Sequence, residues 1–141
     1  MSVSRCLMLP MALAGVVPVA KAQSTHTITL EVDASKERYR FSPARVEAAP
    51  GDVLLFKVAS GAPHGIVFDA KGLSPAARNA LNAALPKRSA DLSSPVLTKN
   101  GAEYRFVLPN LPPGTYGYYC LPHRAYDMRG EILVVKKAPK K

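Results

Sequence analysis

The sequence has 141 residues with 19 Lys and Arg against 10 Asp and Glu, so its formal net charge is +9. Its 13 prolines and 9 glycines favour a turn-rich β domain over a helical bundle, and its length favours one domain. The basic residues are scattered and form no recognition-helix or zinc-finger pattern, which argues against nucleic-acid binding.

The first 22 residues have the pattern of an export signal. Arg5 precedes an apolar run at 6–20, and Ala20-Lys21-Ala22 matches the small-x-small sequence at which signal peptidases cleave. A membrane anchor is the alternative, but the run is shorter than the roughly 20 residues that span a bilayer and contains two prolines. The predicted organisation is a signal peptide at 1–22, one domain at 23–136 and a basic tail at 137–141. We expect export, to the periplasm rather than a thylakoid lumen, without stable membrane insertion.

Alternating polar and apolar residues predict short strands in the first half of the domain. The segment 27–32 alternates clearly, and a second strand is expected around 39–41. Residues 45–48 lead into a turn at Ala49-Pro50-Gly51-Asp52. The segment 53–58 is mostly apolar on both faces, which is typical of a central strand.

The second half contains one predicted helix among further strands. Ser74 has the properties of an N-cap, Pro75 suits the first helical position, and Pro86 ends the helix. Residues 87–100 are expected to form a connecting loop. The remaining predicted strands are 64–68, 103–108, 116–120 and 131–135. Seven or eight short strands with one short inserted helix predict an all-β sandwich.

Cysteine usage gives the first indication of chemistry. Cys6 lies in the predicted signal, so Cys120 is the one cysteine of the remaining chain. Exported proteins mostly pair their cysteines in disulfides. A single thiol in an oxidising compartment is therefore expected to be buried, catalytic or bound to metal.

Four residues have the side chains of a copper site. Cys120, His123 and Met128 follow closely upon one predicted strand, and His64 begins another. Two His, one Cys and a weaker axial Met form the ligand set of a trigonal blue-copper site. A short loop can turn His123 and Met128 toward the same ion as Cys120, while a sandwich can supply His64 from a neighbouring strand. We predict that these four residues bind one copper ion, and that His26 is solvated near the N-terminus.

Other interpretations of these residues are weaker. Each alone has a common structural role, such as a buried small side chain for Cys120 or a core gap-filler for Met128. A zinc site would use more Cys or His and has little use for Met. A Cys-His nucleophile pair lacks an evident Asn or Asp to orient the base. A multicopper enzyme would need further domains and His clusters, so we predict no enzymatic turnover.

The run from Gly114 to Met128 contains the spacing Cys-x2-His-x4-Met, and Pro63-His64-Gly65 precedes an apolar stretch. Both segments resemble the copper-binding regions of plastocyanins and, more broadly, of pseudoazurins and amicyanins. The resemblance implies a cupredoxin Greek-key sandwich and a small, soluble, type 1 copper carrier that shuttles single electrons. It also implies that His123 is the electron port. The chain departs from the family in having Gly65 where plastocyanins usually have Asn, and Ala125-Tyr126-Asp127 where the group tends to have glycines.

A periplasmic copper transport or storage protein is the alternative function. Such proteins more often use Met-rich or His-rich motifs, whereas three of the four methionines here lie in the predicted signal. For an electron carrier we expect redox proteins as partners. The positive net charge favours partners with acidic surfaces, because charge steers encounter. A monomer is expected.

Overall fold

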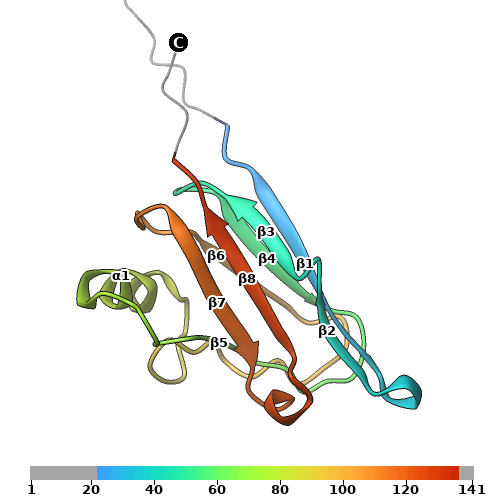
Figure 1. The fold of residues 1–141 in the computed structure, drawn as a ribbon. Helices are drawn as coiled ribbons and strands as arrows, with labels where there is room; N and C mark the ends of the chain where they lie inside the picture. The colour runs from blue at the N-terminus through green and yellow to red at the C-terminus, as the bar shows by residue number, and fades with distance from the viewer. Residues whose placement is uncertain (1–21, 137–141) are drawn as a thin grey trace, which may run out of the picture.

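The computed structural model describes residues 22–136, which form eight strands and one α-helix in two facing layers (Figure 1). The predicted basic tail and all but the last residue of the predicted signal peptide lie outside this range. The elements are β1 (Thr25–Asp33), η1 (Ala34–Lys36), β2 (Arg38–Ser42), β3 (Arg45–Ala48), β4 (Val53–Val58), β5 (Ile66–Phe68), α1 (Pro75–Ala84), β6 (Glu103–Val107), β7 (Gly114–Cys120), η2 (Arg124–Tyr126) and β8 (Arg129–Val134).

Each layer is a four-stranded mixed sheet. One sheet has the order β2-β1-β4-β6 and the other β3-β8-β7-β5. The pairs β1–β4 and β3–β8 are parallel, and the other neighbours are antiparallel. The chain passes between the sheets after each of β2, β3, β4, β5 and β6, so both halves of the sequence contribute to both layers. The predicted all-β sandwich with one inserted helix is confirmed.

The core lies between the sheets and is centred on aromatic rings. Tyr118 makes edge-to-face contacts with Phe41, Phe56 and Phe68 at centroid separations of 4.9, 5.5 and 5.9 Å. All four side chains are almost completely buried. Since Tyr118 is two residues before Cys120 on β7, this packed aromatic cluster lies directly beneath the end of the sandwich at which Cys120 is found.

The helix forms as its sequence predicts. Ser74 accepts a hydrogen bond from the backbone N–H of Ala77 at 3.1 Å, and Pro75 occupies the first turn. Ala77 and Leu81 are buried on one side. The expected loop at 87–100 follows, and its Leu97 pairs with His64 through two backbone hydrogen bonds of 2.7 and 3.0 Å. No helix among the described residues has the length and apolar character needed to cross a membrane.

The prediction for His26 was wrong. His26 lies within β1, and its Nε2 atom is 3.0 Å from Oδ2 of Asp52 in the turn before β4. Asp52 also accepts hydrogen bonds from the backbone N–H groups of Ala49 and Ser24. The parallel pairing of β1 with β4 brings these segments together, a long-range contact that local periodicity does not reveal.

We expect this cluster to make stability depend on pH. Burial raises the pKa of Asp52, but hydrogen bonds from His26, Ala49 and Ser24 outweigh it and hold the pKa below its usual value. A lowered folded-state pKa stabilises the fold above the unfolded-state pKa of about 4, and this contribution is lost as the pH falls through the folded-state pKa. Asp52→Asn should lower the free energy of unfolding at pH 7 by about 1–3 kcal/mol.

Urea denaturation of both proteins between pH 7 and pH 3 checks this expectation. The difference in unfolding free energy should shrink as the pH falls below about 4, because the unfolded chain then takes up a proton on Asp52 and the stabilisation from the lowered folded-state pKa begins to be lost. An equal difference at both ends of the range would contradict it.

Candidate metal centre

Pairing of β5 with β7 brings together residues that are far apart in the sequence. Cys120 is the last residue of β7 and lies opposite Ile66 at the start of β5. His64 lies two positions before Ile66, at the same end of the sandwich. His123 lies in the loop of residues 121–128 between β7 and β8, here called the ligand loop. The donor atoms of His64, Cys120 and His123 all lie within 4.8 Å of one another.

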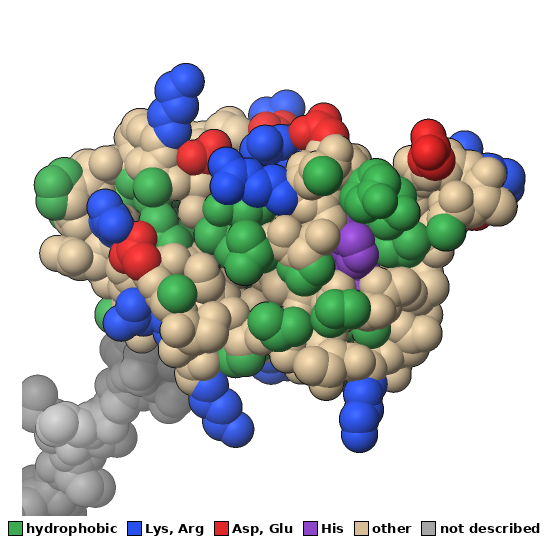
Figure 2. Space-filling view, turned by 90° about the horizontal axis from the view of Figure 1, so that it is seen from below, with side chains coloured by type: hydrophobic (Ala, Val, Ile, Leu, Met, Phe, Trp, Pro, Cys, Tyr) green, Lys and Arg blue, Asp and Glu red, His purple; other side chains and the backbone are tan. Residues whose placement is uncertain are grey.

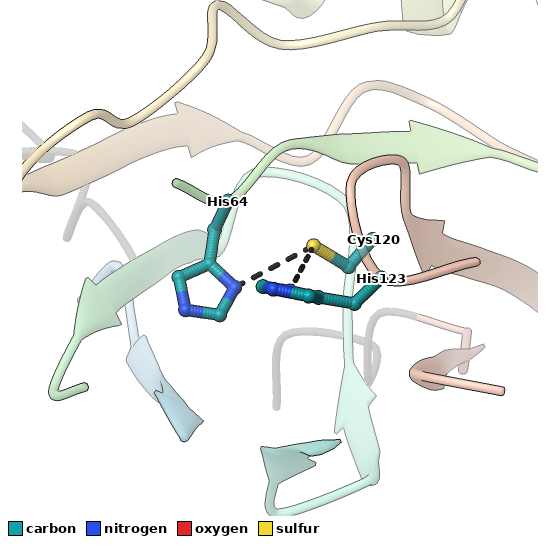
Figure 3. A group of neighbouring side chains, drawn as sticks. All are labelled: His64, Cys120 and His123. Atoms are coloured by element: carbon teal, nitrogen blue, oxygen red, sulfur yellow. Dashed lines mark hydrogen bonds between the residues drawn. The ribbon is translucent and has the colours of Figure 1, made fainter. Parts of the chain in front are cut away.

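The three side chains point at one another, as Figure 3 shows. The Sγ atom of Cys120 is 3.5 Å from Nδ1 of His64 and 3.5 Å from Nδ1 of His123. Two donors that share a metal ion at about 2.0–2.3 Å lie about 3.3–3.8 Å apart at bond angles of about 100–120°. The spacing therefore fits a single ion between one sulfur and two imidazole nitrogens.

The orientation of His64 is set by the loop before it. His64 is fully buried, and its Nε2–H donates to the carbonyl of Ser60 at 2.7 Å. A carbonyl only accepts, so Nε2 carries the proton and the lone pair of Nδ1 faces Cys120. Burial lowers the pKa of His64, which favours this neutral form. Such a hydrogen bond at the far nitrogen is the usual way in which proteins orient a metal-binding imidazole.

Ser60 is a functional position that the sequence analysis missed. Its hydroxyl accepts from the backbone N–H of Val32 at 2.9 Å and donates to the Val32 carbonyl at 3.1 Å. These two bonds fix the loop to β1 and so fix the carbonyl that orients His64. A lone serine in a loop carries no local signal of this role.

The environment of Cys120 is apolar with two backbone donors. The residue is fully buried, and burial raises the pKa of its thiol. Hydrogen bonds from the backbone N–H groups of Gly65 and His123 act in the opposite direction without cancelling this effect. A coordinating cation deprotonates a thiol outright, and the two donors are then placed to stabilise the thiolate.

His123 differs from His64 in reaching the surface. It is partly exposed, and burial, together with the neighbouring His64, lowers its pKa. Leu121, at 52% exposure, lies in the same loop. Figure 2 shows a His side chain at this end of the molecule with apolar side chains around it. The site thus has one deeply buried imidazole and one that opens to a largely apolar surface.

Met128 closes the ligand loop. Its side chain is fully buried, and its carbonyl accepts from the backbone N–H of Cys120 at 2.9 Å. This bond holds Cys120 and Met128 side by side, where the ligand loop leaves β7 and returns to β8. With the thioether of Met128, the predicted donor set is two imidazoles, one thiol and one soft, weak ligand, and such a set suits copper better than zinc.

The family model described as copper-binding proteins of the plastocyanin/azurin family matches residues 28–135. The chain belongs to the plastocyanin/azurin family of copper-binding proteins. It is 32% identical over 126 residues to the chloroplastic plastocyanin of Pisum sativum, covering 85% of this chain and 70% of that protein. It is 35% identical over 94 residues to plastocyanin A/B of Petroselinum crispum, covering 67% of this chain and 86% of that one. The predicted family and its cofactor, copper, are confirmed.

Solved structures agree on the fold. The oxidised plastocyanin of Dryopteris crassirhizoma superposes with a TM-score of 0.60 at 24% identity, covering 78% of this chain and all of that one. A Sinorhizobium pseudoazurin gives a TM-score of 0.52 at 21% identity, covering 82% and 77% of the two chains. The cupredoxin sandwich predicted for this chain is thereby confirmed, while the assignment of the four individual ligands stays a prediction.

The two departures from the family have different structural consequences. A Cβ added at Gly65 would meet Pro122 at 3.8 Å and Leu121 at 4.0 Å, which are ordinary contacts, so a side chain could be accommodated there. The main chain joins the loop that carries His64 to the ligand loop, because the Leu121 N–H donates to the Gly65 carbonyl at 3.2 Å. Asp127 adopts a left-handed conformation with φ of 54°, and its carboxylate accepts from Arg129 Nε at 2.6 Å.

Proposed function

We propose that this chain is a small type 1 copper electron carrier in which His64, Cys120, His123 and Met128 hold one copper ion. The observation that carries the proposal is the convergence of one thiol and two imidazole nitrogens at one end of a rigid sandwich. Burial of Cys120, His64 and Met128 gives the site an apolar surrounding that excludes water from most of the donor set.

The residues of the chain supply a fixed set of donors. Bound copper provides a one-electron couple between Cu(I) and Cu(II). Cys120 provides the strong thiolate donor, and Ser60 holds His64 as a neutral imidazole with Nδ1 directed inward. Since β5, β7 and the base of the ligand loop are joined by backbone hydrogen bonds, the donors change position little between oxidation states. Little rearrangement means a low barrier to electron transfer. With all donors supplied by the protein, we expect no catalytic turnover.

Electron exchange is proposed at His123, the ligand that reaches the surface. The exposed Leu121 and the adjoining Pro122 give its surroundings an apolar rim. The positive net charge favours redox partners with acidic surfaces. The proposed mature protein is the domain 23–136 with its basic tail, exported to the periplasm after removal of residues 1–22.

Addition of Cu(II) to the purified mature protein tests the electron carrier against a copper transport or storage protein. We expect an intense visible absorption from thiolate-to-copper charge transfer, bleached by a mild reductant and restored by an oxidant over repeated cycles. A colourless Cu(II) form, or a protein that loses copper on each reduction, would favour transport or storage instead.

A further inference from the structure

Two tyrosines from opposite sheets meet beside the proposed copper ligands. Tyr126 lies in η2 of the ligand loop, whereas Tyr39 lies in β2 of the other sheet. Their ring centroids are 4.0 Å apart and their planes are inclined by 15°, so the rings are stacked. The ring of Tyr39 also lies 5.1 Å from the ring of His123, inclined by 41°. Tyr39 therefore contacts a proposed ligand and a second side chain of the same loop.

The geometry of η2 explains how one ring reaches both side chains. The backbone N–H of Tyr126 donates to the carbonyl of His123 at 3.1 Å, which is the i to i+3 bond of a 3₁₀ helix. Side chains three positions apart eclipse in a 3₁₀ helix, so His123 and Tyr126 lie on the same side of the turn. Tyr39 is held opposite them by the pairing of β2 with β1. With glycine at position 126, only the contact between Tyr39 and His123 would remain.

The main-chain restraints on the ligand loop stay within it or join it to its own sheet. Bonds join Arg124 to Leu121 and Asp127 to Arg124 inside the loop, and the Leu121 N–H donates to the carbonyl of Gly65, just before β5. Arg124 lies over the ring of Tyr119, which belongs to the adjoining strand of the same sheet. Among residues 22–136, the aromatic contacts that tie this loop to the opposite sheet are thus those of Tyr39 with His123 and with Tyr126, and the stack on Tyr126 is the closer of the two.

We infer that the Tyr39–Tyr126 stack is a positioning device that holds the ligand loop, and with it His123, against the end of the sandwich. The inference rests on the proposed copper site. His123 is the most exposed of the proposed ligands, and it can leave the site only if its loop lifts or its ring turns past Tyr39. Stacking on Tyr126 opposes both movements, because Tyr126 shares the turn of His123 and Tyr39 is anchored in β2.

Three variants of the ligand loop test the inference. Tyr126→Gly removes the stack, and Tyr126→Phe keeps the ring but removes its hydroxyl. Asp127→Gly is the matched control, because it adds a glycine to the same loop, at a residue with φ of 54° that suits glycine, and leaves the stack in place. The measurement is the rate at which excess chelator removes copper from each protein.

We expect copper loss from Tyr126→Gly to be about fivefold faster than from the parent protein, as the energy of one aromatic pair implies. Tyr126→Phe and Asp127→Gly should stay within about twofold, because both retain the pair. Equal rates for Tyr126→Gly and Tyr126→Phe would overturn the inference. So would equal acceleration by Asp127→Gly, which would show that loop flexibility alone is responsible.

A second measurement does not depend on copper. In the metal-free protein, nuclear Overhauser effects between the rings of Tyr39 and His123 should be present in the parent and in Tyr126→Phe, and should weaken or vanish in Tyr126→Gly. Unchanged effects in Tyr126→Gly would contradict the positioning role. If the parent protein formed no coloured copper complex, the proposed function would fail, while this comparison would still decide whether the stack holds His123.

Discussion

Replacing Cys120 by serine is expected to abolish the visible absorption of the Cu(II) protein while the fold persists. The absorption arises from transfer of charge from thiolate sulfur to copper, and a serine oxygen has no electrons of comparable energy to donate. Serine is close to cysteine in size, and the backbone N–H groups of Gly65 and His123 that bond to the thiol can bond to the hydroxyl instead. The cost to stability should therefore be about 1 kcal/mol.

Copper affinity should fall together with the absorption. Loss of a residue that merely orients a metal ligand typically costs about 10–100-fold in affinity, so loss of the thiolate itself should exceed about 100-fold for Cu(I), which prefers soft sulfur donors. Competition titration with a Cu(I) chelator measures this change. Far-ultraviolet circular dichroism of the metal-free variant establishes that the sandwich is intact.

Met128→Leu is the matched control for Cys120→Ser. Met128 is as completely buried as Cys120, and leucine has a similar volume, so the core should tolerate the exchange. The axial ligand tunes the reduction potential of such a site, whereas the thiolate gives it its colour. Met128→Leu should therefore remain coloured with an altered potential. A coloured Cys120→Ser protein, or a colourless Met128→Leu protein, would contradict the proposed roles of the two sulfur atoms.

The sequence predicted the parts of this fold whose pattern is local. In β6, Tyr104 and Phe106 are buried and their neighbours are exposed. The period-2 alternation in the sequence therefore corresponds directly to the buried and exposed faces of the strand. The spacing of Cys120, His123 and Met128 is local too, because Cys120 ends β7 and the short ligand loop that follows carries the other two residues. The segment 45–48, expected only to lead into a turn, is β3, and its pairing partner β8 comes from the other end of the chain.

The residues that surround the site were harder to predict, because their roles depend on contacts between distant segments. Ser60 is hydrogen-bonded to Val32, and Tyr39 stacks on Tyr126. The residues of each pair are far apart in the sequence, and no periodic pattern connects them. The departure at Tyr126 was visible in the sequence, but the residue that it contacts was not. A family pattern thus predicts which residues are metal ligands. The residues that hold those ligands in place, such as Ser60 and Tyr39, can be identified only from the structure of this chain.

Gly130, at the base of the site, is another residue whose role depends on a contact with a distant segment of the chain. The strand predicted at 131–135 left Gly130 outside it, whereas β8 begins at Arg129 and Gly130 lies within it, opposite Tyr118 of β7. Glycine is needed there for space and not for turning. A Cβ at this position would lie 2.5 Å from both Cζ and the hydroxyl oxygen of Tyr118.

Gly130→Ala is accordingly expected to destabilise the protein severely. The ring of Tyr118 cannot withdraw without displacing its neighbours, because it is enclosed edge-to-face by Phe41, Phe56 and Phe68 in the middle of the core. The added methyl group must push β8 away from β7 or displace this ring. Overpacking of a core costs about 1–3 kcal/mol and occasionally more, and the rigid surroundings place this case at the upper end. The melting temperature should fall by roughly 10 °C.

Gly117→Ala on the neighbouring strand is the control that separates steric overlap from the general effect of replacing a glycine in a sheet. Its added Cβ would meet Asp69 at 4.0 Å, an ordinary contact, so the melting temperature should change little. Equal melting temperatures for the two variants would contradict the overlap with Tyr118. Displacement of β8 in Gly130→Ala would also strain the bond between the Cys120 N–H and the Met128 carbonyl at the base of the ligand loop. Copper should therefore be released faster from Gly130→Ala than from Gly117→Ala, because the packing of Tyr118 and the alignment of the sulfur donors depend on the same pair of strands.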